Sequence, residues 1–208
     1  MKTYAFIDAS NLFYGGEKSL GWSIDYQQLA KYLKKKYRVS KIFYFGGIDL
    51  AGYRYDYLKN DSIPLDEVEK HIQKFLKRNK LGQKQKNIVA KYLGRVAFYK
   101  KLQSFGYMLY LKPVKIYRQN HGPVQKKANC DVEMAFYLMK EKRNFSRVIV
   151  LSGDGDFLPV LKYLKEKGKK VVILARGPRT AREIRQFAGS DFRDFVRLEN
   201  YIKFKRKP

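Results

Sequence analysis

Four aspartates occupy positions in the sequence where oxygen ligands could converge. Asp8 ends a short apolar run, Asp131 begins a helix-like stretch, and Asp154 and Asp156 follow a second apolar run within Ser-Gly-Asp-Gly-Asp. Carboxylates are preferred ligands of the hard cations Mg²⁺ and Mn²⁺. Packed together without a cation they would repel one another and raise one another's pKa, whereas a bound metal relieves the repulsion and can activate a water molecule. The pattern therefore predicts a metal-dependent catalytic site formed by these four residues.

Each of these aspartates also has a purely structural explanation. Asp8 could cap the loop after its strand, Asp131 could be the N-cap of its helix, and Asp154 and Asp156 could bond to the backbone of a local turn. Asn11, which follows Asp8 closely, is interpreted as functional but could equally close a polar turn. Two aspartates one residue apart repel in any conformation, so a turn alone explains the second motif less well. Three acidic points at strand ends of one sheet favour a metal site over separate caps.

Basic residues near the predicted site could bind phosphate groups. Three arginines follow an apolar run late in the chain: Arg176, Arg179 and Arg182. They could hold backbone phosphates through paired hydrogen bonds, or they could form a solvated helix face. Lys126 and Lys127 precede Asp131 in a polar segment, Gln119–Lys127, that we expect to be a mobile loop. These lysines could steer a phosphate-bearing substrate toward the metal.

The elements that must position these residues alternate between strands and helices. The patterns predict strands over Tyr4–Asp8, Lys41–Phe45 (ended by Gly46-Gly47), Tyr107–Leu111 with a short partner at Val114–Tyr117, Arg147–Leu151 and Val171–Leu174. They predict helices over Ile24–Tyr37, Pro64–Arg78, Ile88–Phe105, Asp131–Lys142, Phe157–Lys167 and Thr180–Phe187. Such alternation indicates an α/β fold, a mainly parallel sheet with helices on both faces. Ligands bind such sheets at the carboxyl ends of the strands, where the aspartates stand.

The helix that begins at Asp131 is predicted to bury one stripe. Four apolar residues recur at helical spacing: Val132, Ala135, Phe136 and Met139. This stripe is expected to face the sheet, with Asp131 at the edge where the strands end.

The charge balance points to a polyanionic partner. The chain has 208 residues, with 45 Lys+Arg against 19 Asp+Glu and a formal net charge of +26. Between His71 and Cys130 it has 15 Lys or Arg and no acid. We expect the partner to be nucleic acid, the commonest large anion. Several aromatic residues interleave with this acid-free window and could stack on unpaired bases, although most are interpreted as core: Tyr92, Phe98, Tyr99, Tyr107 and Tyr110.

The composition excludes several other classes of protein. A hydrophobic content of 45% is too high for a disordered basic tail. The single cysteine, Cys130, excludes a disulfide framework and a cysteine-based zinc site. The apolar runs have the length of strands, with no export signal or lipidation motif. We therefore expect a cytoplasmic protein without a membrane partner.

Three motifs, in this order and spacing, resemble the NYN domain, in the LabA-like branch of the PIN-like nuclease superfamily. The motifs are Phe6-Ile7-Asp8-x-x-Asn11, Asp131-Val132-x-x-Ala135 and Ser152-Gly153-Asp154-x-Asp156-Phe157-x-Pro159. The resemblance covers roughly Met1–Phe45 and Lys100–Arg176. The stretch near Tyr53–Arg95 is interpreted as a helical insertion. A single domain over residues 1–208 is expected, with the insertion at about 53–95 and a basic tail at about 199–208.

The resemblance implies a Rossmann-like, PIN-like fold and metal-dependent hydrolysis of RNA that leaves a 3′-hydroxyl and a 5′-phosphate. Asp8, Asp131 and Asp154 would be metal-linked carboxylates and Asp156 would complete the pocket. Two further residues would orient a carboxylate or the phosphate: Asn11 and Ser152. Many relatives carry another acid about two helical turns after the residue that matches Asp131, and here that position is Tyr137.

The sequence thus predicts a ribonuclease that uses Mg²⁺ or Mn²⁺ and acts on RNA, with single-stranded DNA as a further partner. The alternative is a non-catalytic RNA-binding protein with a degenerate pocket, which Tyr137 favours. A phosphatase of the haloacid-dehalogenase type is a second alternative, because Gly-Asp-Gly also occurs there. Those enzymes need a second acid two residues after the nucleophile, and Ser10 stands at that distance from Asp8.

Overall fold

The sheet that the sequence predicts is present and its strands are parallel. The computed structural model describes residues 2–56, 58–78, 81–117 and 125–205. The strand order in the sheet is β3-β2-β1-β6-β7-β8, and every neighbouring pair is parallel. The bounds are β1 (Thr3–Asp8), β2 (Val39–Ile48), β3 (Tyr107–Pro113), β6 (Arg147–Leu151), β7 (Lys170–Ala175) and β8 (Phe192–Asp194). The central pair is β1 and β6, so the two aspartate motifs that follow them lie side by side.

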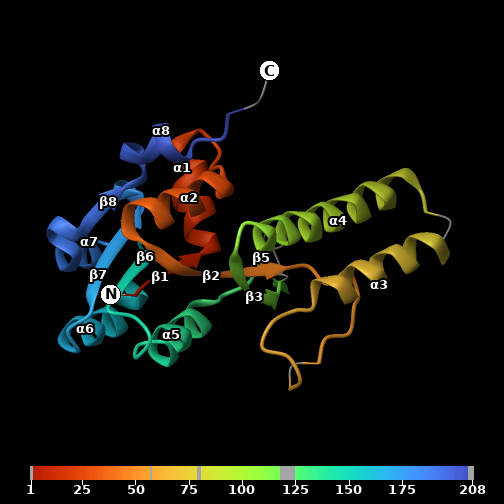
Figure 1. The fold of residues 1–208 in the computed structure, drawn as a ribbon. Helices are drawn as coiled ribbons and strands as arrows, with labels where there is room; N and C mark the ends of the chain where they lie inside the picture. The colour runs from red at the N-terminus through yellow and green to blue at the C-terminus, as the bar shows by residue number, and fades with distance from the viewer. Residues whose placement is uncertain (1, 57, 79–80, 118–124, 206–208) are drawn as a thin grey trace.

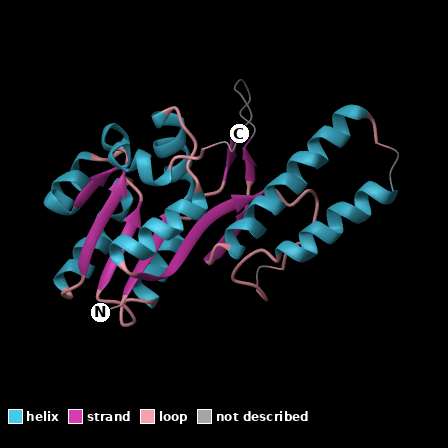
Figure 2. Cartoon of the chain, turned by 45° about the horizontal axis from the view of Figure 1, so that its top comes forward, coloured by secondary structure: helices cyan, strands magenta, loops and turns pink. Residues whose placement is uncertain are grey.

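Helices cover both faces of this sheet (Figures 1 and 2). Their bounds are α1 (Lys18–Leu20), α2 (Tyr26–Tyr37), α3 (Leu65–Arg78), α4 (Gln83–Ser104), α5 (Asp131–Lys140), α6 (Leu158–Glu166), α7 (Arg182–Ala188) and α8 (Glu199–Ile202). Because side chains alternate along a strand, β1 sends Ala5 and Ile7 into the core under α2, α4 and α8. It sends Tyr4 and Phe6 into the second core, under α5, α6 and α7. The predicted α/β fold class is confirmed.

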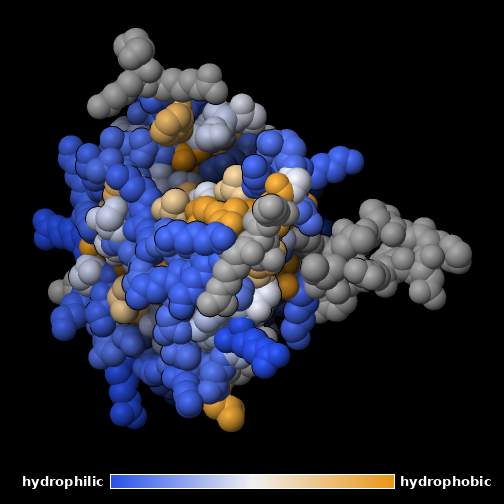
Figure 3. Space-filling model, turned by 90° about the vertical axis from the view of Figure 1, so that its right-hand side faces the viewer, coloured by the Kyte–Doolittle hydropathy of each residue, from blue (hydrophilic) through white to orange (hydrophobic). Residues whose placement is uncertain are grey.

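The α3–α4 pair forms a hairpin that projects from the sheet (Figure 1). The C-terminal half of α4 packs on the sheet through Val96, Tyr99 and Leu102, which are buried in the core. Lys100 bonds to both Asp66 and Glu69 of α3 and so ties the two helices together. The surface seen from the hairpin side is mostly hydrophilic, with hydrophobic side chains gathered in a central patch (Figure 3).

Local signals set several element ends as the sequence predicts. The Asp25 carboxylate accepts a hydrogen bond from the backbone N–H of Gln28, 2.9 Å away, and so caps the start of α2. Gly168 follows α6 with a φ of +73°, a left-handed conformation that favours glycine and ends the helix. The predicted and observed bounds of β6 are identical.

Gly46 and Gly47 were predicted to end the second strand. They do not, because β2 continues through them to Ile48. A Cβ on Gly47 would lie 2.3 Å from the Cβ of Ala128, and one on Gly46 would lie 3.1 Å from the Cβ of Ala9. The two glycines therefore allow neighbouring segments to pack closely against β2, and they do not mark a turn of the chain. They let the segment before α5 cross directly over the strand.

Two further expectations about strands are corrected, and one strand was not expected. The short strand β4 (Lys115–Tyr117) pairs antiparallel with β5 (Gln125–Lys127) and not with β3. The last three residues of the expected loop Gln119–Lys127 therefore form a strand, while residues 118–124 lie outside the described part of the chain. The edge strand β8 was not predicted, because three residues give too short a pattern to recognise.

The predicted buried stripe of α5 is wrong. Val132 is 76% exposed and Phe136 is 55% exposed, whereas Met134, Tyr137 and Leu138 are buried. The helix is apolar on most sides, so its periodicity fits more than one face. The sheet decides between the faces, because Tyr137 fits among the rings of β2 and β3.

Candidate metal centre

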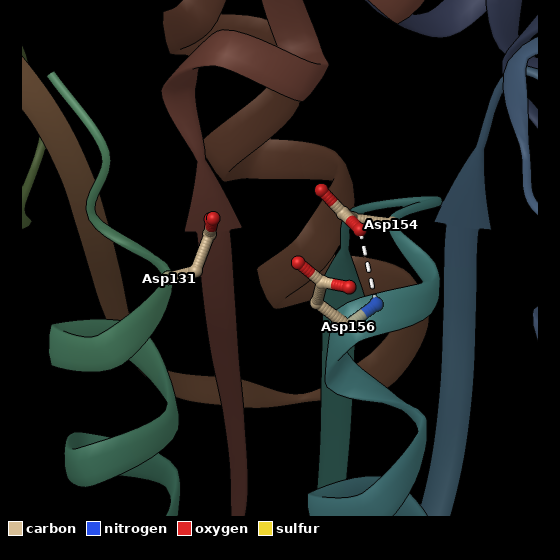
Figure 4. Close-up of side chains that lie close together, drawn as sticks. All are labelled: Asp131, Asp154 and Asp156. Atoms are coloured by element: carbon tan, nitrogen blue, oxygen red, sulfur yellow. Dashed lines mark hydrogen bonds between the residues drawn. The ribbon is translucent and has the colours of Figure 1, made fainter.

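The predicted aspartates meet at the carboxyl edge of the sheet. Asp8 is the last residue of β1, Asp154 and Asp156 follow the neighbouring strand β6, and Asp131 is the first residue of α5. One carboxylate oxygen from each of Asp131, Asp154 and Asp156 lies within 4.8 Å of the other two. Figure 4 shows these three side chains pointing toward one another from α5 and from the turn after β6. Two segments distant in sequence thus form one acidic cluster.

Asp8 is not one of these three residues but lines the same cavity as Asp131 and Asp154, and it is the most buried of the four aspartates. Its Oδ1 accepts hydrogen bonds from the backbone N–H groups of Ser10 (2.9 Å) and Asn11 (3.1 Å). Burial raises the pKa of Asp8 to about 6, and the nearby Asp131 carboxylate adds to the rise, while these hydrogen bonds oppose it. The loop-capping explanation of Asp8 therefore holds in the structure, and the carboxylate still faces the acidic site.

Asn11 and Ser152 connect the two strand ends. The Ser152 hydroxyl donates to Asp8 Oδ2 at 3.2 Å and accepts from the backbone N–H of Asp154 at 3.2 Å. Asn11 Oδ1 accepts from the backbone N–H of Gly153 at 3.1 Å. These contacts fix the turn that carries Asp154 relative to β1, which is a positioning role for both side chains.

Asp131 could have been the N-cap of its helix, but the structure shows that it is not. The cap residue is Cys130, which forms no capping bond through its side chain. Asn129 takes that role in part, because its Oδ1 accepts from the backbone N–H of Asp131 at 2.8 Å. The Asp131 carboxylate is directed toward the acidic cluster (Figure 4).

The turn explanation of Gly-Asp-Gly-Asp holds only for one of its aspartates. Asp154 Oδ1 accepts from the backbone N–H of Asp156 at 3.0 Å, whereas the Asp156 side chain extends toward the cluster. The two glycines of the turn permit close packing, because a Cβ on Gly153 would lie 2.9 Å from Thr180 Cα and one on Gly155 would lie 2.3 Å from a Glu183 oxygen. The turn is thereby pressed against the segment that leads into α7.

A cavity of about 940 Å³ opens between this sheet edge and α4. Asp8, Asp131 and Asp154 line one side of it. Asp49, which sequence reasoning missed, also lines it and follows β2 directly. Had the predicted strand been extended through Gly46-Gly47 to Ile48, it would have placed Asp49 at the same edge of the sheet as Asp8.

Another part of the lining of this cavity is basic and aromatic. It is formed by residues of α4 and of the π-helical segment Asn11–Glu17: Phe13, Tyr14, Lys91, Tyr92, Arg95 and Phe98. Sequence reasoning noted Tyr92 and Phe98 but interpreted most such aromatics as core. It missed Phe13 and Tyr14, which are 40% and 65% exposed.

The predicted phosphate-binding residues do not all lie at this cavity. Arg179 lines it, and Arg182 is exposed at the start of α7. Arg176 instead pairs with Asp194, 3.1 Å away, and lines a separate hollow. The side chains of Lys126 and Lys127 lie outside what the structure describes.

Tyr137 lies away from the cavity. Its ring packs against Tyr110 with centroids 4.0 Å apart, and its hydroxyl bonds to Asp61 at 3.3 Å. The residue therefore belongs to the packing between α5 and the sheet. An acid at this position would not face Asp131 and its partners.

Comparison with known proteins assigns the family. The sequence model of the NYN domain matches residues 59–199, more than half of the chain. The chain belongs to the NYN domain family. The match begins after β1 and β2, so Asp8 and Asp49 lie outside the matched segment, and the sheet brings them to the same edge as Asp154.

Two full-length likenesses accompany the NYN assignment. The chain is 22% identical to the low amplitude and bright protein LabA of Synechococcus elongatus over 98% of this chain and 88% of that protein. The crystal structure of a protein of unknown function from Vibrio parahaemolyticus has a TM-score of 0.61 at 18% identity, covering 98% of this chain and 96% of the other. The similarity to the Vibrio structure shows a shared fold and nothing more.

Among the described residues, no helix combines the length and the apolar character needed to span a bilayer.

The donor set of the NYN site fits a hard divalent cation. Its candidate ligands are carboxylates, and three of them reach one point. Mg²⁺ and Mn²⁺ prefer such oxygen ligands, while zinc sites draw chiefly on histidine and cysteine. Cys130 is buried and burial raises its pKa to about 12, which disfavours the thiolate form that binds metals.

Proposed function

We propose that this chain is a ribonuclease of the cytoplasm that hydrolyses RNA phosphodiester bonds with Mg²⁺ or Mn²⁺. The observation that carries the proposal is the acidic cluster of Asp131, Asp154 and Asp156 inside a protein of net charge +26. A basic surface attracts a polyanion, whereas bare carboxylates repel phosphate. A cation between the carboxylates and a phosphate makes the two features compatible.

Each residue then has a defined part. Asp8, Asp131, Asp154 and Asp156 would hold the cation, directly or through water. When bound, the cation supplies neutralising charge and a water activated for attack on phosphorus. Arg179 would hold the RNA backbone and stabilise charge that develops on phosphorus. Two further side chains would keep the carboxylates oriented through the bonds described above: Asn11 and Ser152.

The test is cleavage of end-labelled single-stranded RNA in Mn²⁺ or Mg²⁺ by the wild type and by Asp154→Asn. We expect the substitution to lower the cleavage rate by more than about 100-fold, because it removes a carboxylate from the cation site. EDTA should abolish cleavage by the wild type. The matched control is Glu166→Gln, which removes the same charge from an exposed position at the end of α6.

Cleavage that survives Asp154→Asn would contradict the assignment. RNA binding without cleavage by the wild type would favour the non-catalytic alternative. Single-stranded DNA of the same sequence, run in parallel, tests the second expected substrate. Hydrolysis of a generic aryl phosphate would instead favour the phosphatase alternative.

We also propose that residues 1–208 act as one domain, with a helical insertion at about 53–95 that includes α3 and the first half of α4 and with a basic tail at about 199–208. Strands from both ends of the chain, β1 and β8, belong to one sheet. The NYN match, residues 59–199, extends from before α3 to α8.

A further inference from the structure

The segment that follows Asp8 carries two aromatic side chains into solvent beside the acidic site. Phe13 and Tyr14 lie on the π-helical turn Asn11–Glu17, a rare helix type that occurs often at functional sites. They are 40% and 65% exposed, and their rings contact edge to face with centroids 5.1 Å apart. Exposed rings lose the stabilisation that burial gives, so this pair calls for an explanation other than packing.

Hydrogen bonds at both ends of the π-helical turn hold the Phe13–Tyr14 pair in place near the carboxyl edge of the sheet. The π-helical turn begins at Asn11, whose side chain holds Gly153, and ends near Glu17, whose carboxylate accepts from the backbone N–H of Ile24. Phe13 and Tyr14 line the same cavity as the carboxylates. A ligand bound at the carboxylates would therefore occupy the same cavity as these rings.

Positive charge lies beside the rings and elsewhere in the lining of the same cavity. The Lys18 ammonium is 5.7 Å from the centroid of Phe13. From α4, Lys91 and Arg95 also line the cavity, and the Arg95 guanidinium is 5.8 Å from the centroid of the Phe98 ring. Aromatic faces together with cations in one groove are the combination that binds unpaired nucleotides: the rings stack on bases and the cations hold the backbone.

We propose that Phe13 and Tyr14 form a stacking platform for the bases of an unpaired strand, whose backbone is held by Lys91 and Arg95. The inference rests on the proposed function and specifies its substrate as single-stranded nucleic acid. Bases in a duplex already stack on their neighbours and offer no free face to a side chain. The carboxylates would then meet the backbone of a strand that the platform has positioned.

The test measures binding in EDTA, so that it depends on neither metal nor cleavage. A fluorescent single-stranded RNA, a single-stranded DNA of the same sequence and the matching RNA duplex are titrated with wild type, Tyr14→Ala, Tyr14→Trp and Tyr201→Ala. Tyr201 is the matched control, because it is 62% exposed and lies on α8. We expect Tyr14→Ala to weaken binding of both single strands by at least about fivefold, because one stacked base is lost.

Tyr14→Trp, which retains an aromatic face, should bind like the wild type, and so should Tyr201→Ala. The duplex should bind less tightly than the single strand and be unaffected by Tyr14→Ala. Equal affinities of Tyr14→Ala and Tyr201→Ala for the single strand would overturn the proposal, as would an equal loss for the duplex. If Tyr14→Ala has no effect on binding, the ribonuclease proposal can still be supported by cleavage that depends on Asp154. If no cleavage is found, a loss of single-strand binding in Tyr14→Ala would still support the stacking platform, so the two proposals can fail separately.

Discussion

Asp8 shows how burial at one residue couples the site to the stability of the protein. Its carboxylate is nearly enclosed, and the three hydrogen bonds that it accepts do not offset the loss of water. Burial raises its pKa from 3.8 to about 6. In the metal-free protein the charged form of Asp8 is therefore the costly one.

This shift predicts how stability depends on pH. The folded state binds the Asp8 proton more tightly than the unfolded state, so the free energy of unfolding is highest below the unfolded pKa and falls as pH rises through about 6. The full loss is roughly 3 kcal/mol. Between pH 5 and pH 8 about half of this loss, roughly 1.4 kcal/mol, should appear in urea unfolding in EDTA of the wild type and not of Asp8→Asn, which carries no charge at this position.

The difference between the two proteins is the readout, because it cancels the titration of all other groups. Saturating Mg²⁺ or Mn²⁺ should reduce the loss, since a cation favours the charged form of Asp8. A wild-type and Asp8→Asn pair with the same pH dependence in EDTA would contradict the shifted pKa.

At the same scale, the residue types predicted most of the site but not all of it. Four aspartates were predicted to meet, because Asp8, Asp131 and Asp154 stand at the end of an apolar run or at a helix start and the sheet brings such points together. The fourth, Asp156, follows Asp154 in the same turn. Asp49 was missed because the glycines before it imitate a strand end. Arg176 was grouped with Arg179 by sequence spacing, yet its partner Asp194 comes from a strand too short to predict.

Among the elements, β2 and the segment before α5 depend on one contact. Gly47 leaves room for Ala128, whose chain continues directly to Asp131. We expect Gly47→Ala to lower the free energy of unfolding by about 1–3 kcal/mol, because the new methyl group meets a position that cannot yield without moving the backbone. Displacement of Asp131 should also weaken Mn²⁺ binding, measured by calorimetry.

Gly94 provides the matched control for this prediction. It lies within α4, and a Cβ added there meets nothing within 4 Å. Gly94→Ala should stabilise the protein by about 0.5–1 kcal/mol, because alanine is the better helix former. Unfolding midpoints that fall equally in the two variants would show that the contact at Gly47 is not the cause.

The helix α5 shows why element faces are harder to predict than element positions. Its start was predicted to the residue, but Phe136 was expected inside and Tyr137 was considered only as a missing acid. An almost wholly apolar helix carries little information about which side is buried, and the aromatic surface of β2 and β3 selects Tyr137. That choice depends on residues far away in the sequence.

For the whole molecule, the position of the charge matters more than its sum. The acid-free window from His71 to Cys130 includes all of α4, whose Lys91 and Arg95 line the same cavity as the carboxylates. Acids from outside the window neutralise two of its lysines, Lys100 and Lys112. The other Lys and Arg side chains of the window can then bind a polyanion, because the window contains no Asp or Glu that would pair with them.

Salt dependence tests this distribution. Each phosphate that a cation neutralises on a single strand contributes about −0.7 to the slope of the logarithm of the association constant against the logarithm of salt concentration. Lys91→Gln and Arg95→Gln should each flatten the slope by about that amount, measured by anisotropy in EDTA between about 50 and 200 mM salt. Lys167→Gln removes the same charge at the far end of α6, near the opposite edge of the sheet, and should leave the slope unchanged. Equal slopes for all three variants would mean that the charge acts as a diffuse field and that α4 does not contact the strand.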